Sequence, residues 1–147
     1  MAASDPMELV PPDISGYRAG NTGIPYVTTF DSGKPGPHVL LTAVVHGNEL
    51  CGAITLDFLF RENVRPKRGR MTLAFCNVAA YLQFNRDNPT ASRFVDEDFN
   101  RVWSPDRLDS DQRSAVSLAT TALAASQCWP HSTSSAFFGL AGSPNAP

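Results

Sequence analysis

Two apolar runs separated by a helical pattern constrain the fold of this chain more than any other feature. The first run covers residues 39–45, between Pro37 and Gly47, and the second covers residues 71–78. Runs of this kind predict strands that are buried on both faces, as in a parallel sheet. Between them, residues 49–63 place apolar side chains at three- and four-residue steps, which predicts a helix. Strand, helix and strand in this order predict a βαβ unit.

Further elements are predicted on either side of this unit. Residues 26–30 are rich in β-forming side chains and predict a short edge or hairpin strand. Residues 85–101 predict a polar loop. Ser104, Pro105 and Asp106 then form a typical helix start, which predicts a helix to about residue 126.

Composition and charge argue against several classes of protein. A chain of 147 residues fits one domain, and its formal net charge of -2 disfavours a protein that binds nucleic acid through a large basic face. No apolar run approaches the roughly 20 residues that cross a bilayer. The first residues carry acids and prolines where a signal peptide is basic and apolar. Cys51, Cys76 and Cys128 are widely spaced and indicate a reducing compartment, so we expect a cytoplasmic protein.

The sequence from His46 to Glu49 stands where the first predicted strand ends and the helix begins. Ligand sites in open α/β sheets lie beyond such strand ends. The spacing lets both side chains reach one ion from a tight turn, and we expect Gly47 to permit that turn. A histidine and a carboxylate are a common part of a catalytic zinc site. The alternative is an ordinary histidine at a strand end and a glutamate favoured by the helix dipole.

Two further segments contain candidate site residues. In residues 93–101, Arg93, Asn100 and Arg101 surround three acidic residues. Arginine suits the bidentate capture of a carboxylate, and asparagine can orient an amide, although a solvated charged loop has the same composition. His131 lies in a Ser/Thr-rich stretch. Taken alone, His131 is an ordinary residue of a polar tail.

Taken in order, HGNE after a buried strand, RFVDEDFNR and HSTS resemble the succinylglutamate desuccinylase and aspartoacylase family, which belongs with the zinc carboxypeptidases by fold. The resemblance implies an α/β, zinc-carboxypeptidase-like three-layer fold with a mostly parallel sheet, incomplete at the C-terminus. Residues 1–36 would form N-terminal strands and loops of the same domain. Residues 37–131 would form a partial zinc hydrolase domain, and residues 132–147 an uncharged, disordered tail.

The resemblance also assigns site residues and one Zn²⁺ per chain. The three implied zinc ligands are His46, Glu49 and His131. Arg93 falls on the arginine that polarises the scissile carbonyl group. Asn100 and Arg101 fall on the pair that binds the carboxylate of the substrate. The general-base glutamate should follow the third ligand, but this sequence has no acidic residue after Asp111.

These assignments predict a zinc-dependent hydrolase of N-acyl amino acids or related amides and esters. Its partner would be a small-molecule acyl-amino acid; we expect no nucleic acid and no membrane, and the sequence predicts no oligomeric state. The missing base leads us to expect a shortened or frame-shifted enzyme with weak or absent catalysis. Three alternatives stay open: a zinc carboxypeptidase acting on peptides, a non-catalytic metal-binding remnant, and an unrelated α/β binding domain with a chance HxxE.

Overall fold

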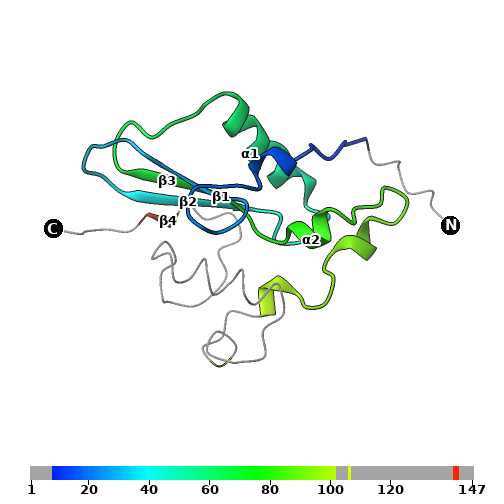
Figure 1. Cartoon of the computed structure of the whole chain (residues 1–147). Coiled ribbons are helices and arrows are strands. Elements are labelled where there is room, and N and C mark those ends of the chain that lie inside the picture. Colours follow the sequence, from blue (N-terminus) through cyan, green and yellow to red (C-terminus); the bar gives the residue numbers. More distant parts are fainter. Residues whose placement is uncertain (1–7, 102–105, 107–140, 143–147) are drawn as a thin grey trace.

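The computed structural model describes residues 8–101, residue 106 and residues 141–142 of the chain. Within this part, helix α1 lies along one side of a mixed β-sheet (Figure 1). A short helix, α2, follows the third strand. The elements are β1 (Val27–Asp31), β2 (His38–Ala43), α1 (Leu50–Arg61), β3 (Arg70–Phe75), α2 (Val78–Tyr81) and β4 (Ala141–Gly142), with 3-10 helices at Ser15–Tyr17, Pro89–Ser92 and Phe99–Arg101.

The strands lie in the order β1-β3-β2-β4. β2 and β3 are parallel, with Leu40 opposite Thr72, and α1 connects them, so the predicted βαβ unit is confirmed. β1 pairs antiparallel with β3, and the two residues of β4 pair antiparallel with β2. The sheet is therefore mixed. The α/β class agrees with the prediction and is compatible with a zinc-carboxypeptidase-like fold, whose full three-layer arrangement stays a prediction.

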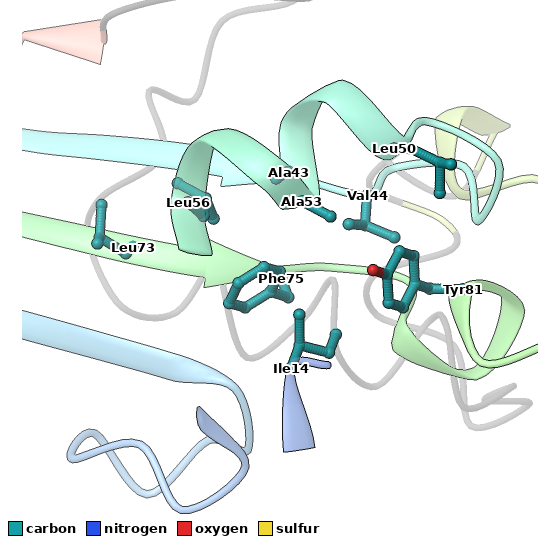
Figure 2. Packing of buried hydrophobic residues seen from close by; sticks show 9 residues of the cluster. All are labelled: Ile14, Ala43, Val44, Leu50, Ala53, Leu56, Leu73, Phe75 and Tyr81. Atoms are coloured by element: carbon teal, nitrogen blue, oxygen red, sulfur yellow. The ribbon is translucent and has the colours of Figure 1, made fainter. Parts of the chain in front are cut away.

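The main hydrophobic core lies between α1 and the adjoining face of the sheet (Figure 2). Leu73 of β3 has no exposed surface, and Leu50, Ala53 and Leu56 of α1 are buried against that face. Spacings of three residues along a helix put such side chains on one face, which explains why the 49–63 pattern forms α1. The whole cluster comprises Ile14, Ala43, Val44, Leu50, Ala53, Leu56, Leu73, Phe75 and Tyr81.

Aromatic stacking packs the segment before β1 against this core. The ring of Tyr17 stacks on Phe60 at 4.2 Å and on Phe75 at 5.7 Å between ring centroids. Its hydroxyl group donates a 2.7 Å hydrogen bond to Asp57 Oδ1. Burial, followed by this hydrogen bond and the negative charge of Asp57, raises the pKa of Tyr17 to about 12. Residues before β1 are therefore part of the packing of α1.

The two parallel strands end earlier than the apolar runs predict. β2 stops at Ala43 because Val44 has a φ of 60°, in the left-handed region that β-branched residues rarely adopt. β3 stops at Phe75, and the Asn77 side chain accepts a hydrogen bond from the amide of Ala80 as the N-cap of α2. The prediction of strand through residue 78 was wrong for residues 76–78. Apolar character does not distinguish a buried strand from a short buried helix.

The helix predicted from residue 104 to about residue 126 lies outside the described residues except at residue 106. In the part of the chain that the structure describes, no helix combines the length and the apolar character required to span a bilayer.

Candidate functional site

The turn between β2 and α1 carries His46 and Glu49. The amide of Glu49 donates to the carbonyl oxygen of His46 at 3.0 Å, which closes the turn. In return, the amide of His46 donates to Glu49 Oε2 at 3.0 Å. Glu49 occupies the N-cap position of α1. Together the two contacts close the turn on itself and hold the Glu49 carboxylate beside the backbone of His46.

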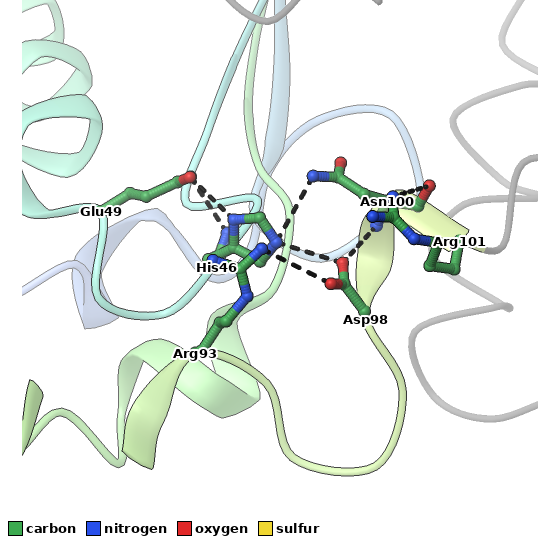
Figure 3. Close-up of polar contacts among 6 residues, drawn as sticks. All are labelled: His46, Glu49, Arg93, Asp98, Asn100 and Arg101. Carbon is green, nitrogen blue, oxygen red and sulfur yellow. Dashed lines mark hydrogen bonds and ion pairs between the residues drawn. The ribbon is translucent and has the colours of Figure 1, made fainter. Parts of the chain in front are cut away.

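The imidazole of His46 lies between two carboxylates (Figure 3). Its Nδ1 is 2.8 Å from Glu49 Oε1, and its Nε2 is 3.1 Å from Asp98 Oδ1. The His46 side chain is only 5% exposed, whereas that of Glu49 is 40% exposed. A neutral imidazole has one N–H group, so it can donate to only one of two ionised carboxylates. The two carboxylates therefore present one more hydrogen-bond acceptor to the ring than a neutral histidine can satisfy.

Asp98 is brought to the ring by a local turn. Its Oδ1 accepts a hydrogen bond from the amide of Asn100 at 2.9 Å, and its carbonyl oxygen accepts one from the amide of Arg101 at 2.8 Å. Burial acts to raise the pKa of Asp98, but hydrogen bonds from Asn100 and His46, with the charges of His46 and Arg93, outweigh it and lower that pKa. Asp98 is therefore held as a carboxylate.

The sequence did not single out Asp98 among the three acids of its loop. An aspartate that accepts from the amide two residues later is a recognisable turn pattern, and here that residue is Asn100. The turn is therefore a local signal in the sequence. The contact between Asp98 and His46 is not, because 52 positions separate the two residues.

The structure brings three of the other predicted site residues to this turn. Arg93 Nη2 is 3.5 Å from Asp98 Oδ2, and the Arg93 side chain is 44% exposed. Asn100 Nδ2 is 3.4 Å from His46 Nε2. Arg101 is exposed and its Nη1 donates to the carbonyl oxygen of Asn100, so its side chain adjoins the site without contacting His46. His131 lies outside the described residues.

Gly47 has a different role from the one predicted. Its backbone is not among the left-handed glycines, so conformational freedom is not the reason for a glycine here. A Cβ atom at this position would be 2.3 Å from the carbonyl oxygen of Ser92 and 2.3 Å from the carbonyl carbon of Ala80. Two other backbone segments therefore pack against Gly47. The left-handed residue that redirects the chain is Val44.

The residues of this turn fit two positions of a zinc site. Nitrogen and oxygen ligands at typical zinc distances are about 3.3 Å apart in a tetrahedral arrangement, close to the 2.8 Å between Nδ1 and Glu49 Oε1. A cation between these atoms would also leave Nε2–H free to donate to Asp98, which satisfies the ring. Among the described residues, no group of three or more His, Cys, Asp or Glu side chains has the arrangement of a metal site. A zinc site at this turn would therefore require a third ligand from outside them.

One of the comparisons with known proteins gave a match. A family model described as the succinylglutamate desuccinylase/aspartoacylase catalytic domain matches residues 35–140, which is more than half of the chain. The matched range includes the 46–49 turn, the 93–101 segment and position 131. Neither the search of curated proteins nor the search of solved structures gave a match.

Proposed function

Because this chain belongs to the succinylglutamate desuccinylase/aspartoacylase family of hydrolases, we propose that it is a zinc-dependent hydrolase of N-acyl amino acids or related amides and esters. Zinc would be held by His46, Glu49 and His131, one ion per chain. The proposed partner is a small-molecule acyl-amino acid. The proposed location is the cytoplasm, in line with the free thiols of Cys51 and Cys76.

The observation that carries this proposal is the placement of the two carboxylates on the His46 ring. Glu49 Oε1 lies at Nδ1 and Asp98 Oδ1 lies at Nε2. A metal ligand histidine typically donates its other N–H group to a carboxylate, which fixes the tautomer of the ring. The arrangement supports Nδ1 as the ligand atom and Nε2–H as the donor to Asp98.

The other predicted residues would bind and orient the substrate. When bound, zinc would lower the pKa of a water molecule and polarise the scissile carbonyl group. The guanidinium group of Arg93 would stabilise the negative charge that develops on the carbonyl oxygen. Asn100 and Arg101 would hold the carboxylate of the amino acid and thereby fix the position of the amide bond. Asp98 would keep the proton of His46 on Nε2.

The test is hydrolysis of N-acetyl-aspartate and N-succinyl-glutamate by the full chain loaded with Zn²⁺. We expect slow release of the free amino acid, because the sequence has no acidic residue after Asp111 that could serve as the general base, and no release after treatment with a chelator. Arg93→Ala should lower kcat by about 10²–10³-fold, the effect of removing one oxyanion donor. Arg61→Ala is the matched control, because Arg61 is exposed on α1 and pairs with Asp57.

Other outcomes would lead to different conclusions. Cleavage of short peptides but not of acyl-amino acids would replace the proposal with a carboxypeptidase activity. Zinc binding without turnover of any substrate would indicate a non-catalytic metal-binding protein. Equal activity in Arg93→Ala and Arg61→Ala would remove Arg93 from the site.

A further inference from the structure

At Gly47, two other backbone segments come so close to the candidate site that they leave no room for a side chain. A Cβ atom there would lie within 2.6 Å of three atoms: the carbonyl oxygen of Ser92, and the carbonyl carbon and oxygen of Ala80. Real Cβ atoms essentially never approach other atoms this closely, so only glycine fits. The turn that holds His46 and Glu49 is therefore packed directly against the backbone before Arg93.

A hydrogen bond joins the same two segments. The amide of Gly47 donates to the carbonyl oxygen of Arg93 at 3.0 Å. Ser92 is 2% exposed, and its hydroxyl group donates to the carbonyl oxygen of Pro89 at 2.9 Å. The amide of Arg93 in turn donates to the carbonyl oxygen of Thr90. The carbonyl group of Arg93 is thus bound to Gly47, and its amide is bound to the 3-10 helix Pro89–Ser92.

A second connection closes a ring of contacts. From Arg93, the side chain reaches Asp98 Oδ2, and Asp98 Oδ1 reaches His46 Nε2. His46 precedes Gly47, so the path returns to its start. In this closed path of contacts, the hydrogen bond from Gly47 to Arg93 joins backbone atoms and depends on their close approach. The other two contacts join side chains. Without the Gly47 link, Arg93 would be tied to His46 only through an exposed guanidinium group.

We propose that Gly47 is a positioning residue that fixes Arg93 relative to the pair His46 and Glu49. The absence of a side chain lets residues 92–93 dock on the turn, and the Gly47 amide sets their register. A larger residue would push the turn away from both Ser92 and Ala80 while leaving the internal hydrogen bonds of the 46–49 turn in place. The inference rests on the proposed function, because it concerns how Arg93 meets the reacting carbonyl group.

The first experiment measures amide hydrogen exchange in the unchanged chain. The Gly47 amide should exchange at least about tenfold more slowly than that of Asn48, because buried hydrogen bonds protect amides. Among the described residues, Asn48 offers the contrast of an amide without an assigned acceptor. Equal exchange at the two positions would overturn the inference. This measurement needs no variant and no activity.

The second experiment compares Gly47→Ala with Gly16→Ala in the full chain loaded with Zn²⁺. Gly16 is the matched control, because a Cβ atom there meets nothing within 4 Å. In Gly47→Ala, kcat should fall by about 10²-fold, the effect of a small misplacement, while KM and zinc affinity change by less than about threefold. The double variant Gly47→Ala/Arg93→Ala should be no worse than Arg93→Ala, because both remove the same contribution. Losses that multiply would overturn the inference.

Nuclear magnetic resonance separates failure of this inference from failure of the proposed function. If the unchanged chain hydrolyses no substrate, the proposed function fails, but backbone resonances still report on docking. Gly47→Ala should shift the amide signals of residues 92–101, together with those next to Ala80 and at the start of α1, and leave those of β1 unchanged. Gly16→Ala should leave residues 92–101 unchanged. Unshifted signals at residues 92–101 in Gly47→Ala would overturn the inference.

Discussion

His46 and Asp98, 52 positions apart in the sequence, meet through a 3.1 Å contact between Nε2 and Oδ1. The contact joins the turn after β2 to the segment that carries Arg93, Asn100 and Arg101. Because Glu49 occupies the other ring nitrogen, the His46 ring has a carboxylate at each end. This pairing supports the proposal that His46 is a metal ligand.

Replacing Asp98 should weaken metal binding without unfolding the chain. Asp98→Asn keeps the shape of the side chain but removes the charge that holds the proton on His46 Nε2. Loss of such a partner typically costs about 10–100-fold in metal affinity. Competition with a chromophoric chelator measures this affinity. Asp96→Asn in the same loop is the control, since Asp96 is exposed; equal affinities of the two variants would contradict the prediction.

Truncating Leu73 should destabilise the fold strongly. Leu73 has no exposed surface and lies in the core between β3 and α1. Leu73→Ala should lower the free energy of unfolding by about 2–5 kcal/mol, because it leaves a cavity. The same substitution at Leu82, which is 68% exposed, should cost less than about 0.5 kcal/mol. Urea denaturation followed by circular dichroism compares them, and a similar loss at both positions would show that α1 does not pack as described.

The hydroxyl group of Tyr17 should make stability fall at alkaline pH. Its pKa is raised to about 12 by burial and by Asp57, above the value of about 10 in an unfolded chain. The folded state therefore binds this proton more tightly, and the associated stability is complete below pH 10 and is lost as the pH rises towards 12.

Tyr17→Phe tests this pH dependence. The variant should show a smaller loss of stability between pH 10 and pH 12 than the unchanged chain. At neutral pH it should be less stable by about 0.5–1.5 kcal/mol, because the hydrogen bond to Asp57 is absent. Denaturation curves at several pH values measure both effects. An identical pH profile in the two chains would show that Tyr17 is not coupled to folding.

The two described cysteines should differ in reactivity. Cys51 is exposed, whereas Cys76 is buried and its pKa is raised to about 12 by burial. In a Cys128→Ser background, a thiol reagent should modify one thiol quickly in the native chain and the second only after denaturation. Fast modification of both thiols in the native chain would contradict the burial of Cys76, which directly follows β3. Cys51→Ser should abolish the fast phase.

Much of the fold and part of the site follow from local sequence patterns. The apolar runs and the helical spacing between them predict β2, α1 and β3, since burial decides all three. The strand-to-helix junction predicts where His46 and Glu49 lie. The early end of β2 was not predicted, because a valine gives no signal for a left-handed backbone.

What the sequence could not predict depends on contacts between distant segments. The fit of Gly47 against Ser92 and Ala80 needs three separate segments to be in place, and no local pattern reports it. The same holds for the pairing of Asp98 with His46. The sequence gives the identity of each residue but not its neighbours in space, so the roles of Gly47 and Asp98 could be inferred only from the structure.

Zinc content per chain tests most directly whether His46 belongs to a three-ligand zinc site. Elemental analysis of the purified full chain should find about one zinc ion, as a site of three protein ligands requires. His46→Ala and His131→Ala should each lose that zinc, while His38→Ala, a histidine near the start of β2, should keep it. Zinc that is absent from the unchanged chain, or that survives His46→Ala, would contradict the account.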